Sequence, residues 1–184
     1  MAESDGSLVL RAIKGEEEAF GQLYDRYARL VRAICHDGTR DLERAADLAQ
    51  EVFLRAYERL GELKEPERFG PWVAGIARNV ARECRRSEMR DRHVWLGEGS
   101  QEVAESQKDQ RWEQREAPER LAYVAEAMER LNDEERLALH SFYLQGQDVE
   151  KARRVAGVSR SSFYRLLSRA RQRIEEYVRE REGR

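Results

Sequence analysis

The sequence predicts an all-α protein made of two small helical domains joined by a flexible linker. Apolar residues recur at three- and four-residue steps in several segments, and no segment shows the strict alternation of a half-buried strand. The three prolines, Pro66, Pro71 and Pro118, all stand between these segments. With 184 residues and 40% hydrophobic side chains, the chain is large enough to bury two compact cores.

The first domain is expected over residues 1–93 and contains three long helices. Periodic apolar residues place the first helix at about 16–36 and the second at about 42–60. Residues 61–70 form a loop, and Pro71 stands at a favoured first position of the third helix. The apolar residues of that third helix are Trp72, Val73, Ile76, Ala77, Val80, Ala81 and Cys84.

The second domain is expected over residues 119–184, after a linker at 94–118. The linker segment loses helical periodicity and is rich in Gln, Ser and acidic residues. A fourth helix begins near Arg120, with apolar residues Leu121, Val124, Ala125 and Met128. Asn132 and Glu135 have the spacing of a capping box and start a fifth helix that ends before Gly146.

Charge is separated into blocks along the chain, although the net charge is only −2. Residues 68–92 sum to +4 and residues 151–173 to +8, while the segment 93–150 between them sums to −8. A merely solvated surface mixes both signs, so two basic blocks favour two contacts with a polyanion.

The second basic block has the pattern of a helix-turn-helix. Gly157 is suited to end a first helix because that position needs positive φ, and Ser159 is suited to cap a second helix. Phe163, Leu167 and Ala170 form the core face of the second helix, and hydroxyls and guanidiniums cover its other faces. These polar residues suit the base edges and phosphates of a major groove, although a basic solvated face is the alternative. The candidate DNA-binding residues are Ser159, Arg160, Ser161, Ser162, Tyr164, Arg165, Ser168, Arg169 and Arg171.

The composition argues against several other classes of protein. There is no export signal and no run of about 18 apolar residues, so a cytoplasmic protein without membrane insertion is expected. Cys35 and Cys84 are expected to be reduced and to fill small apolar sites. Scattered histidines and the lack of a Gly-rich phosphate loop or a paired nucleophile predict no metal, no cofactor and no enzymatic activity.

Three motifs resemble the extracytoplasmic-function (ECF) type of bacterial RNA polymerase sigma factor, the compact sigma-70 kind that holds only regions two and four. AADLAQEVFLRAY, residues 45–57, is similar to the region-two helix that binds the clamp helices of the polymerase β′ subunit. RFGPWVAGIARNVARECRRS, residues 68–87, is similar to the promoter-melting segment, and residues 131–174 are similar to region four.

The resemblance implies two further sets of functional residues. The polymerase-binding residues are Asp47, Gln50, Glu51, Leu54 and Arg55. The residues expected at the minus-ten promoter element are Phe69, Trp72, Arg78, Asn79, Arg82, Arg85 and Arg86. Trp72 also lies in phase with Ile76 and Val80, so a core position is the alternative for that ring.

Two departures from the family pattern concern the helix-turn-helix. Ala152 and Arg153 stand where the family usually has an Ile-Ala pair, so an Arg must extend its head to solvent or shift the hairpin. Leu166 stands where the family commonly has a basic residue.

The resemblance therefore implies a non-enzymatic sigma factor that brings core RNA polymerase to promoters. Its expected partners are the β′ clamp helices, the β flap, double- and single-stranded promoter DNA, and an anti-sigma factor. A stand-alone helix-turn-helix regulator would leave the first basic block unexplained. A helical adaptor or anti-sigma-like protein is a further alternative, against which both basic blocks argue.

Overall fold

The computed structural model describes residues 3–96 and 119–183, without the side chains of residue 88, residues 91–96 and residue 119. These ranges contain helices and turns and no strand, and the chain divides into two compact units, Met1–Lys108 and Asp109–Arg184. The all-α, two-domain prediction is confirmed. Most of the predicted linker, residues 97–118, lies outside the described residues. No helix in the described ranges is long and apolar enough to span a bilayer.

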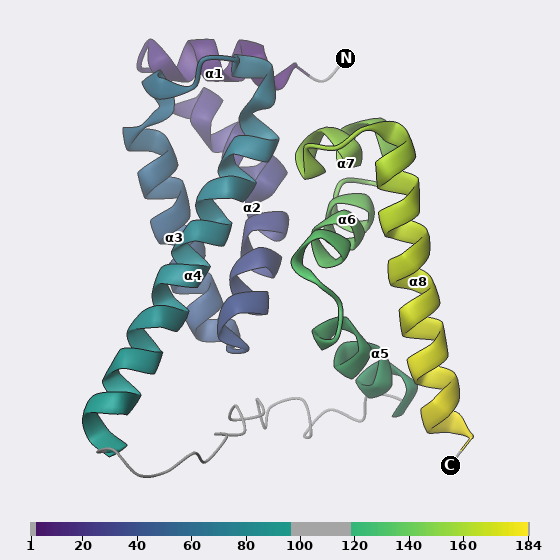
Figure 1. Ribbon diagram of the computed structural model, residues 1–184. Helices are drawn as coiled ribbons and strands as arrows, with labels where there is room; N and C mark the ends of the chain where they lie inside the picture. The colour runs from purple at the N-terminus through teal and green to yellow at the C-terminus, as the bar shows by residue number, and fades with distance from the viewer. Residues whose placement is uncertain (1–2, 97–118, 184) are drawn as a thin grey trace. The chain divides into compact units, whose positions relative to one another are not determined.

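In the first unit, α2 packs against both α3 and α4, and α1 packs against α2 (Figure 1). Two short 3-10 turns, η1 and η2, form the connection between α3 and α4. The elements are α1 (Asp5–Ile13), α2 (Glu17–Thr39), α3 (Leu42–Glu58), η1 (Leu60–Glu62), η2 (Pro66–Arg68) and α4 (Phe69–Leu96).

The core of the first unit combines aliphatic side chains with a cluster of aromatic rings. The ring of Phe20 lies with its edge toward Phe53 and Phe69, both at 6.4 Å between ring centroids. Elsewhere α2 and α4 approach closely, because a Cβ at Gly38 would lie 2.7 Å from the Cβ of Ala81. Glycine at position 38 therefore sets the spacing of these two helices.

Two features of the first unit differ from the sequence prediction. Helix α1 was not predicted, because nine residues give too few turns for a clear periodic pattern and an isolated helix of this length is not stable. Helix α4 begins at Phe69, so Pro71 is its third residue and not its first. Proline fits there because the first four N–H groups of a helix have no intrahelical partner.

In the second unit, α8 packs against α5, α6 and α7 (Figure 1). The predicted capping box is confirmed, with Asn132 and Glu135 each accepting from the other's backbone N–H. Leu121 and Ala125 are exposed, and Ala127 is the buried residue of α5 instead. The elements are α5 (Glu119–Glu129), α6 (Asp133–Leu144), α7 (Val149–Ala156) and α8 (Arg160–Glu182).

Polar contacts tie the C-terminal half of α8 to α5 and α6. Arg173 donates to the buried carboxylate of Glu135 at 2.8 Å. The hydroxyl of Tyr177 donates to Glu126 of α5 at 2.6 Å, and Arg181 pairs with the same carboxylate at 3.0 Å. Arg173, the last cation of the second basic block, therefore serves the fold of this unit.

Candidate nucleic-acid and protein interfaces

The turn between α7 and α8 has the predicted geometry. Gly157 adopts a left-handed conformation with φ 71° and ends α7. The Ser159 hydroxyl accepts from the backbone N–H of Ser162 at 3.2 Å and starts α8. Phe163, Leu167 and Ala170 are buried, as their spacing predicts. The start of α8 is therefore set by a cap within a few residues, and its apolar face is held by the core of the second unit.

The predicted DNA-binding residues of α8 lie on its solvent side. All are exposed except Ser162, which is half-buried. The Ser162 hydroxyl accepts from Arg165 at 3.1 Å, and the guanidinium of Arg160 lies 6.0 Å from the ring centre of Tyr164. The first turn of α8 thus presents guanidiniums and hydroxyls that are already held in place.

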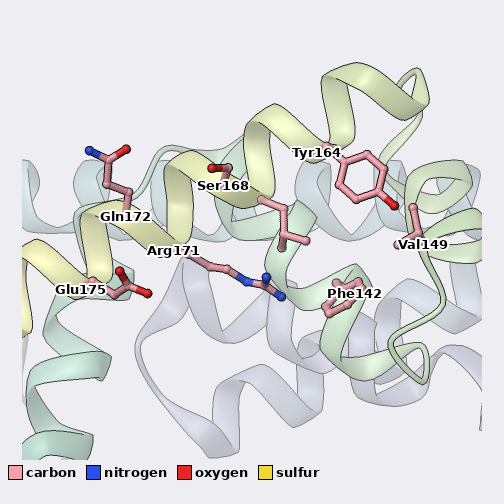
Figure 2. A pocket seen from close by; sticks show the side chains of 8 residues that line it. Phe142, Val149, Tyr164, Ser168, Arg171, Gln172 and Glu175 are labelled. Carbon is pink, nitrogen blue, oxygen red and sulfur yellow. The ribbon is translucent and has the colours of Figure 1, made fainter.

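A groove of about 380 Å³ borders this face of α8 (Figure 2). Phe142, Val149 and Leu167 supply its apolar lining, and Tyr164 and Ser168 lie along its edge. The Arg171 guanidinium stands 5.3 Å from the ring centre of Phe142, over the face of the ring. Arg171 is therefore oriented by α6 as well as by its own helix.

The structure accommodates both departures in the helix-turn-helix. Ala152 takes the fully buried place, and Arg153 is half-buried and donates to Glu150 at 2.7 Å. The hydrogen bond from Arg153 lowers the pKa of Glu150, whose carboxylate also lies 3.9 Å from Arg160. Leu166 is partly buried and packs against the domain core. An arginine at position 153 thus extends along α7 to an acidic neighbour and leaves the core to Ala152.

The basic face of α4 is the second candidate DNA surface. Asn79, Arg82, Arg85 and Arg86 are exposed, and Arg78 is half-buried. Arg90, which the sequence analysis did not single out, is also exposed on this helix. Its position within the first basic block was the signal that could have identified it.

The two aromatic residues at the start of α4 differ in exposure. Phe69 is fully buried, and its ring lies 5.5 Å from that of Tyr27 and 5.9 Å from that of Trp72. As a core residue, Phe69 has no surface to offer a base, and we leave it out of the DNA surface. Trp72 is half-buried, so part of its ring lies at the surface.

The predicted polymerase-binding residues share one side of α3. Asp47, Gln50 and Leu54 are exposed, and Leu54 leaves 59% of its surface open. Arg55 donates to Glu83 of α4 at 2.8 Å and to Glu51 at 2.6 Å. These hydrogen bonds, the one to Glu83 foremost, raise the pKa of Arg55. Arg55 therefore links α3 to α4 besides facing solvent.

Tyr57 adds an apolar group that the sequence analysis missed. It leaves 44% of its surface exposed one turn after Leu54, and its ring lies 4.9 Å from that of Phe20. Tyr57 ends the AADLAQEVFLRAY motif three residues after Leu54, and this helical spacing could have placed it on the same face as Leu54. Leu54 and Tyr57 together give this side of α3 an apolar patch.

Both cysteines are free thiols. Cys35 is buried in α2, and this burial raises the pKa of its thiol to about 12. Arg44 donates to the half-buried Sγ of Cys84 at 3.5 Å. Within the described ranges, no group of three or more His, Cys, Asp or Glu side chains is arranged to hold a metal ion.

Comparison with known proteins identifies the family. Residues 23–91 match the model of sigma-70 region 2. The RNA polymerase sigma factor NccH of Alcaligenes xylosoxydans xylosoxydans is 30% identical over 175 residues, which cover 92% of this chain and 92% of NccH. The chain belongs to the ECF group of sigma-70 RNA polymerase sigma factors.

Two longer sigma factors match at higher identity. The probable RNA polymerase sigma factor RfaY of Xanthomonas campestris pv. campestris is 34% identical over 87% of this chain, and the ECF sigma factor BldN of Streptomyces coelicolor is 34% identical over 92%. The chain spans 40% of the length of RfaY and 65% of that of BldN. These relatives extend the likeness beyond region two into the second unit.

Solved structures share the fold at lower identity. CnrH, in complex with the cytosolic domain of CnrY, has a TM-score of 0.62 at 21% identity and covers 95% of this chain and 96% of CnrH. The sigma factor RpoE of Bartonella quintana, in complex with the anti-sigma factor NepR, has a TM-score of 0.56 at 18% identity and covers 87% of this chain and 96% of RpoE.

Proposed function

We propose that this sigma-family chain binds core RNA polymerase and directs initiation at particular promoters. The observation that carries the proposal is the pair of exposed basic helix faces, on α4 and α8, built over cores that bury their own apolar sides. Two separated cationic surfaces fit a protein that contacts promoter DNA at two places. In this proposal the chain acts as a non-enzymatic subunit in the cytoplasm.

The first domain, residues 1–93, opens the minus-ten element. Asn79 has both a donor and an acceptor for one base edge, and the exposed arginines of α4 neutralise phosphates. The partly exposed ring of Trp72 supplies a surface against which an unstacked base rests, a contact worth roughly 1–3 kcal/mol. In this proposal DNA opening begins at the start of α4, beside the predicted loop at 61–70.

The second domain, residues 119–184, reads the minus-thirty-five element in the major groove. Arg160, Ser161 and Ser162 lie at the N-terminal end of α8, the end by which recognition helices contact bases. Arg169 and Arg171 follow further along the helix and bind phosphates. Residues 94–118 connect the two domains in this proposal.

The side of α3 that carries Asp47, Gln50, Glu51, Leu54 and Arg55 binds the β′ clamp helices. Its exposed leucine is flanked by charges, which gives an apolar centre with a polar rim. The second domain also contacts the β flap. CnrH and RpoE are solved with CnrY and NepR respectively, and NepR is an anti-sigma factor; we propose that an anti-sigma factor of its own regulates this chain.

Reconstitution with core polymerase tests the proposal. Purified chain is added to core enzyme, and transcripts are sequenced from a library of randomised promoters. The proposal predicts a stable complex and transcripts from templates that share two sequence elements. Binding to core enzyme without promoter-specific initiation would favour the adaptor alternative, and DNA binding without core binding would favour a stand-alone regulator.

A further inference from the structure

Helix α1 lies against the connection between α3 and α4. It packs on α2 and η2 and also contacts η1 and the start of α4. Leu8 and Val9 are fully buried in this interface. The match to sigma-70 region 2 begins at residue 23, so α1 precedes the matched segment, and no step of the proposed function uses it.

The first turn of α1 touches η2 directly. The Ser4 hydroxyl donates to Oε1 of Glu67 at 2.7 Å. Gly6 lies so close that an added Cβ would stand 2.3 Å from the same oxygen and 2.7 Å from Cδ of Glu67. Only glycine therefore fits at position 6 while Glu67 keeps its place beside Ser4.

A second series of contacts runs from α1 to the start of α4. Asp5 accepts hydrogen bonds from Arg26 and from the hydroxyl of Tyr27. Burial and the Asp5 carboxylate raise the pKa of Tyr27, so its phenol keeps the proton that it donates. The Tyr27 ring packs on Phe69, which in turn packs on Trp72.

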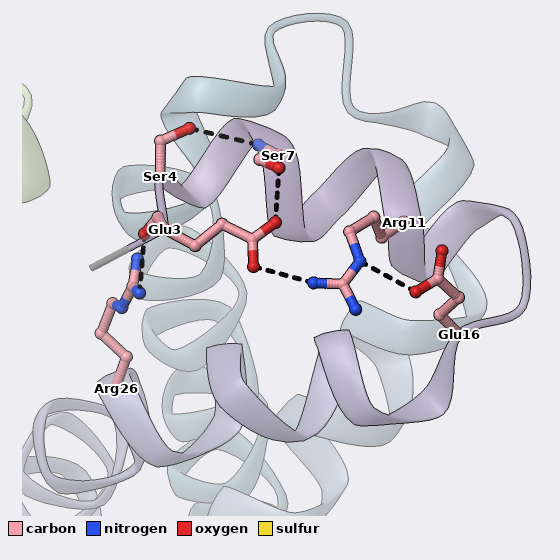
Figure 3. A network of polar contacts seen from close by, with 6 residues as sticks. All are labelled: Glu3, Ser4, Ser7, Arg11, Glu16 and Arg26. Carbon is pink, nitrogen blue, oxygen red and sulfur yellow. Dashed lines mark hydrogen bonds and ion pairs between the residues drawn. The ribbon is translucent and has the colours of Figure 1, made fainter. Parts of the chain in front are cut away.

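The outer side of α1 carries a polar network (Figure 3). Glu3 accepts from Ser7 and from Arg11, and Arg11 also donates to Glu16 at 2.8 Å. Water and salt screen such exposed pairs, so they orient the helix, while the buried Leu8 and Val9 anchor it.

We propose that α1 is a positioning element for promoter opening. Through Ser4, Gly6 and Asp5 it fixes η2 and the start of α4, and so sets how the Trp72 ring is presented to the DNA. The inference rests on the proposed function. Ser4 also caps α1 by accepting from the backbone N–H of Ser7, and in this proposal neither Ser4 nor Gly6 touches DNA.

The test substitutes Gly6 and compares the result with a matched control. Gly6→Ala pushes the Glu67 side chain away from Ser4, whereas Gly21→Ala on α2 meets nothing within 4 Å. Hydrogen exchange of the amides at 61–70 reports the contact without any promoter. Gly6→Ala should speed this exchange about three- to tenfold, the range expected for one lost hydrogen bond, and Gly21→Ala should not.

The second readout is promoter opening with holoenzyme on a template selected by the wild-type protein. Gly6→Ala should slow opening of duplex DNA about three- to tenfold. A template already opened by mismatched bases should restore the wild-type rate, and core affinity should stay within about twofold. In a protein that already carries Glu67→Ala, adding Gly6→Ala should not slow duplex opening further, because the side chain that the new methyl group displaces is absent. Ser4→Ala removes the same hydrogen bond without added bulk, together with the N-cap bond to the N–H of Ser7, and should act in the same direction.

The outcomes separate the two proposals. A loop that exchanges equally fast in Gly6→Ala, Ser4→Ala and Gly21→Ala overturns the inference. If Gly6→Ala slows initiation equally on duplex and pre-opened templates, the inference is also overturned, because α1 would then contribute to folding and not to DNA opening. A wild-type protein that fails to initiate at any promoter overturns the proposed function, and the exchange result still decides the contact of α1 with the loop.

Discussion

The helix starts of the two candidate DNA surfaces are fixed by contacts of different range. In the second unit, Gly157 ends α7 and Ser159 caps α8 within three residues of each other. In the first unit, the start of α4 rests on Tyr27, and the turn before it rests on Ser4, more than sixty residues earlier in the chain.

The two surfaces should respond differently to substitution. Where a local cap fixes the start of a helix, removing the cap destabilises that helix end alone. A surface set by distant packing changes when any of several remote residues changes, because its geometry is the sum of those contacts. The first surface is therefore the more sensitive to substitutions far from the DNA.

The largest expected effect concerns the core beneath the first surface. Phe69→Ala should destabilise the first unit by about 3–5 kcal/mol, because a fully buried ring leaves a cavity. Phe163→Ala is the matched change in the second unit, where the ring is equally buried. Hydrogen exchange measures each unit separately, and each variant should lose protection in its own unit only. Equal loss in both units would show that they unfold as one.

Asn79→Ala tests base reading on the first surface. Loss of one base-edge contact should cost about 1–3 kcal/mol in promoter preference at one position. A pre-opened promoter should restore the rate but not the preference. Gln22→Ala, which removes an exposed amide from α2, is the control. If preference and rate both stay at the wild-type level, Asn79 does not contact a base.

Ser159→Ala tests the local contacts of the second surface. Loss of the N-cap should lower the stability of the second unit by about 1 kcal/mol. Ser168→Ala, in the middle of α8, should leave stability unchanged or slightly raised because alanine favours a helix interior. Chemical denaturation of the isolated variants measures both. A Ser159→Ala variant as stable as wild type would show that packing of Phe163 alone fixes the start of α8.

The smallest expected effects distinguish base-specific contacts from phosphate contacts along α8. Arg160→Ala should change which upstream sequence is preferred, because Arg160 lies at the N-terminal end of α8, which enters the major groove. Arg169→Ala should weaken all sequences about equally and reduce the salt slope by about one unit. Affinities for upstream variants at several salt concentrations measure both. The reverse assignment would mean that α8 lies differently in the groove.

Most helices were predictable because their signals are local. The capping box at Asn132 and Glu135, the glycine at 157 and the serine at 159 each act within four residues, and the structure has all of them. The apolar face of Phe163, Leu167 and Ala170 follows from helical spacing alone.

Residue exposure at the start of α4 was less predictable. Phe69 and Trp72 are three residues apart and both aromatic, so the sequence did not distinguish a core ring from a partly exposed one. The structure separates them because Phe20 and Tyr27 of α2 pack against Phe69. Likewise, nothing in the sequence of α3 indicated that Arg55 pairs with Glu83 of α4.

The all-α class, the helix-turn-helix caps and the positions of both basic blocks follow from the amino-acid sequence alone, because periodicity, capping and charge are properties of short segments. Helix packing was needed to show that α1 lies against η2, that Phe69 is buried, and that Gly6 leaves the space that the Glu67 side chain occupies. Such contacts join residues tens of positions apart, and their geometry depends on how whole helices pack.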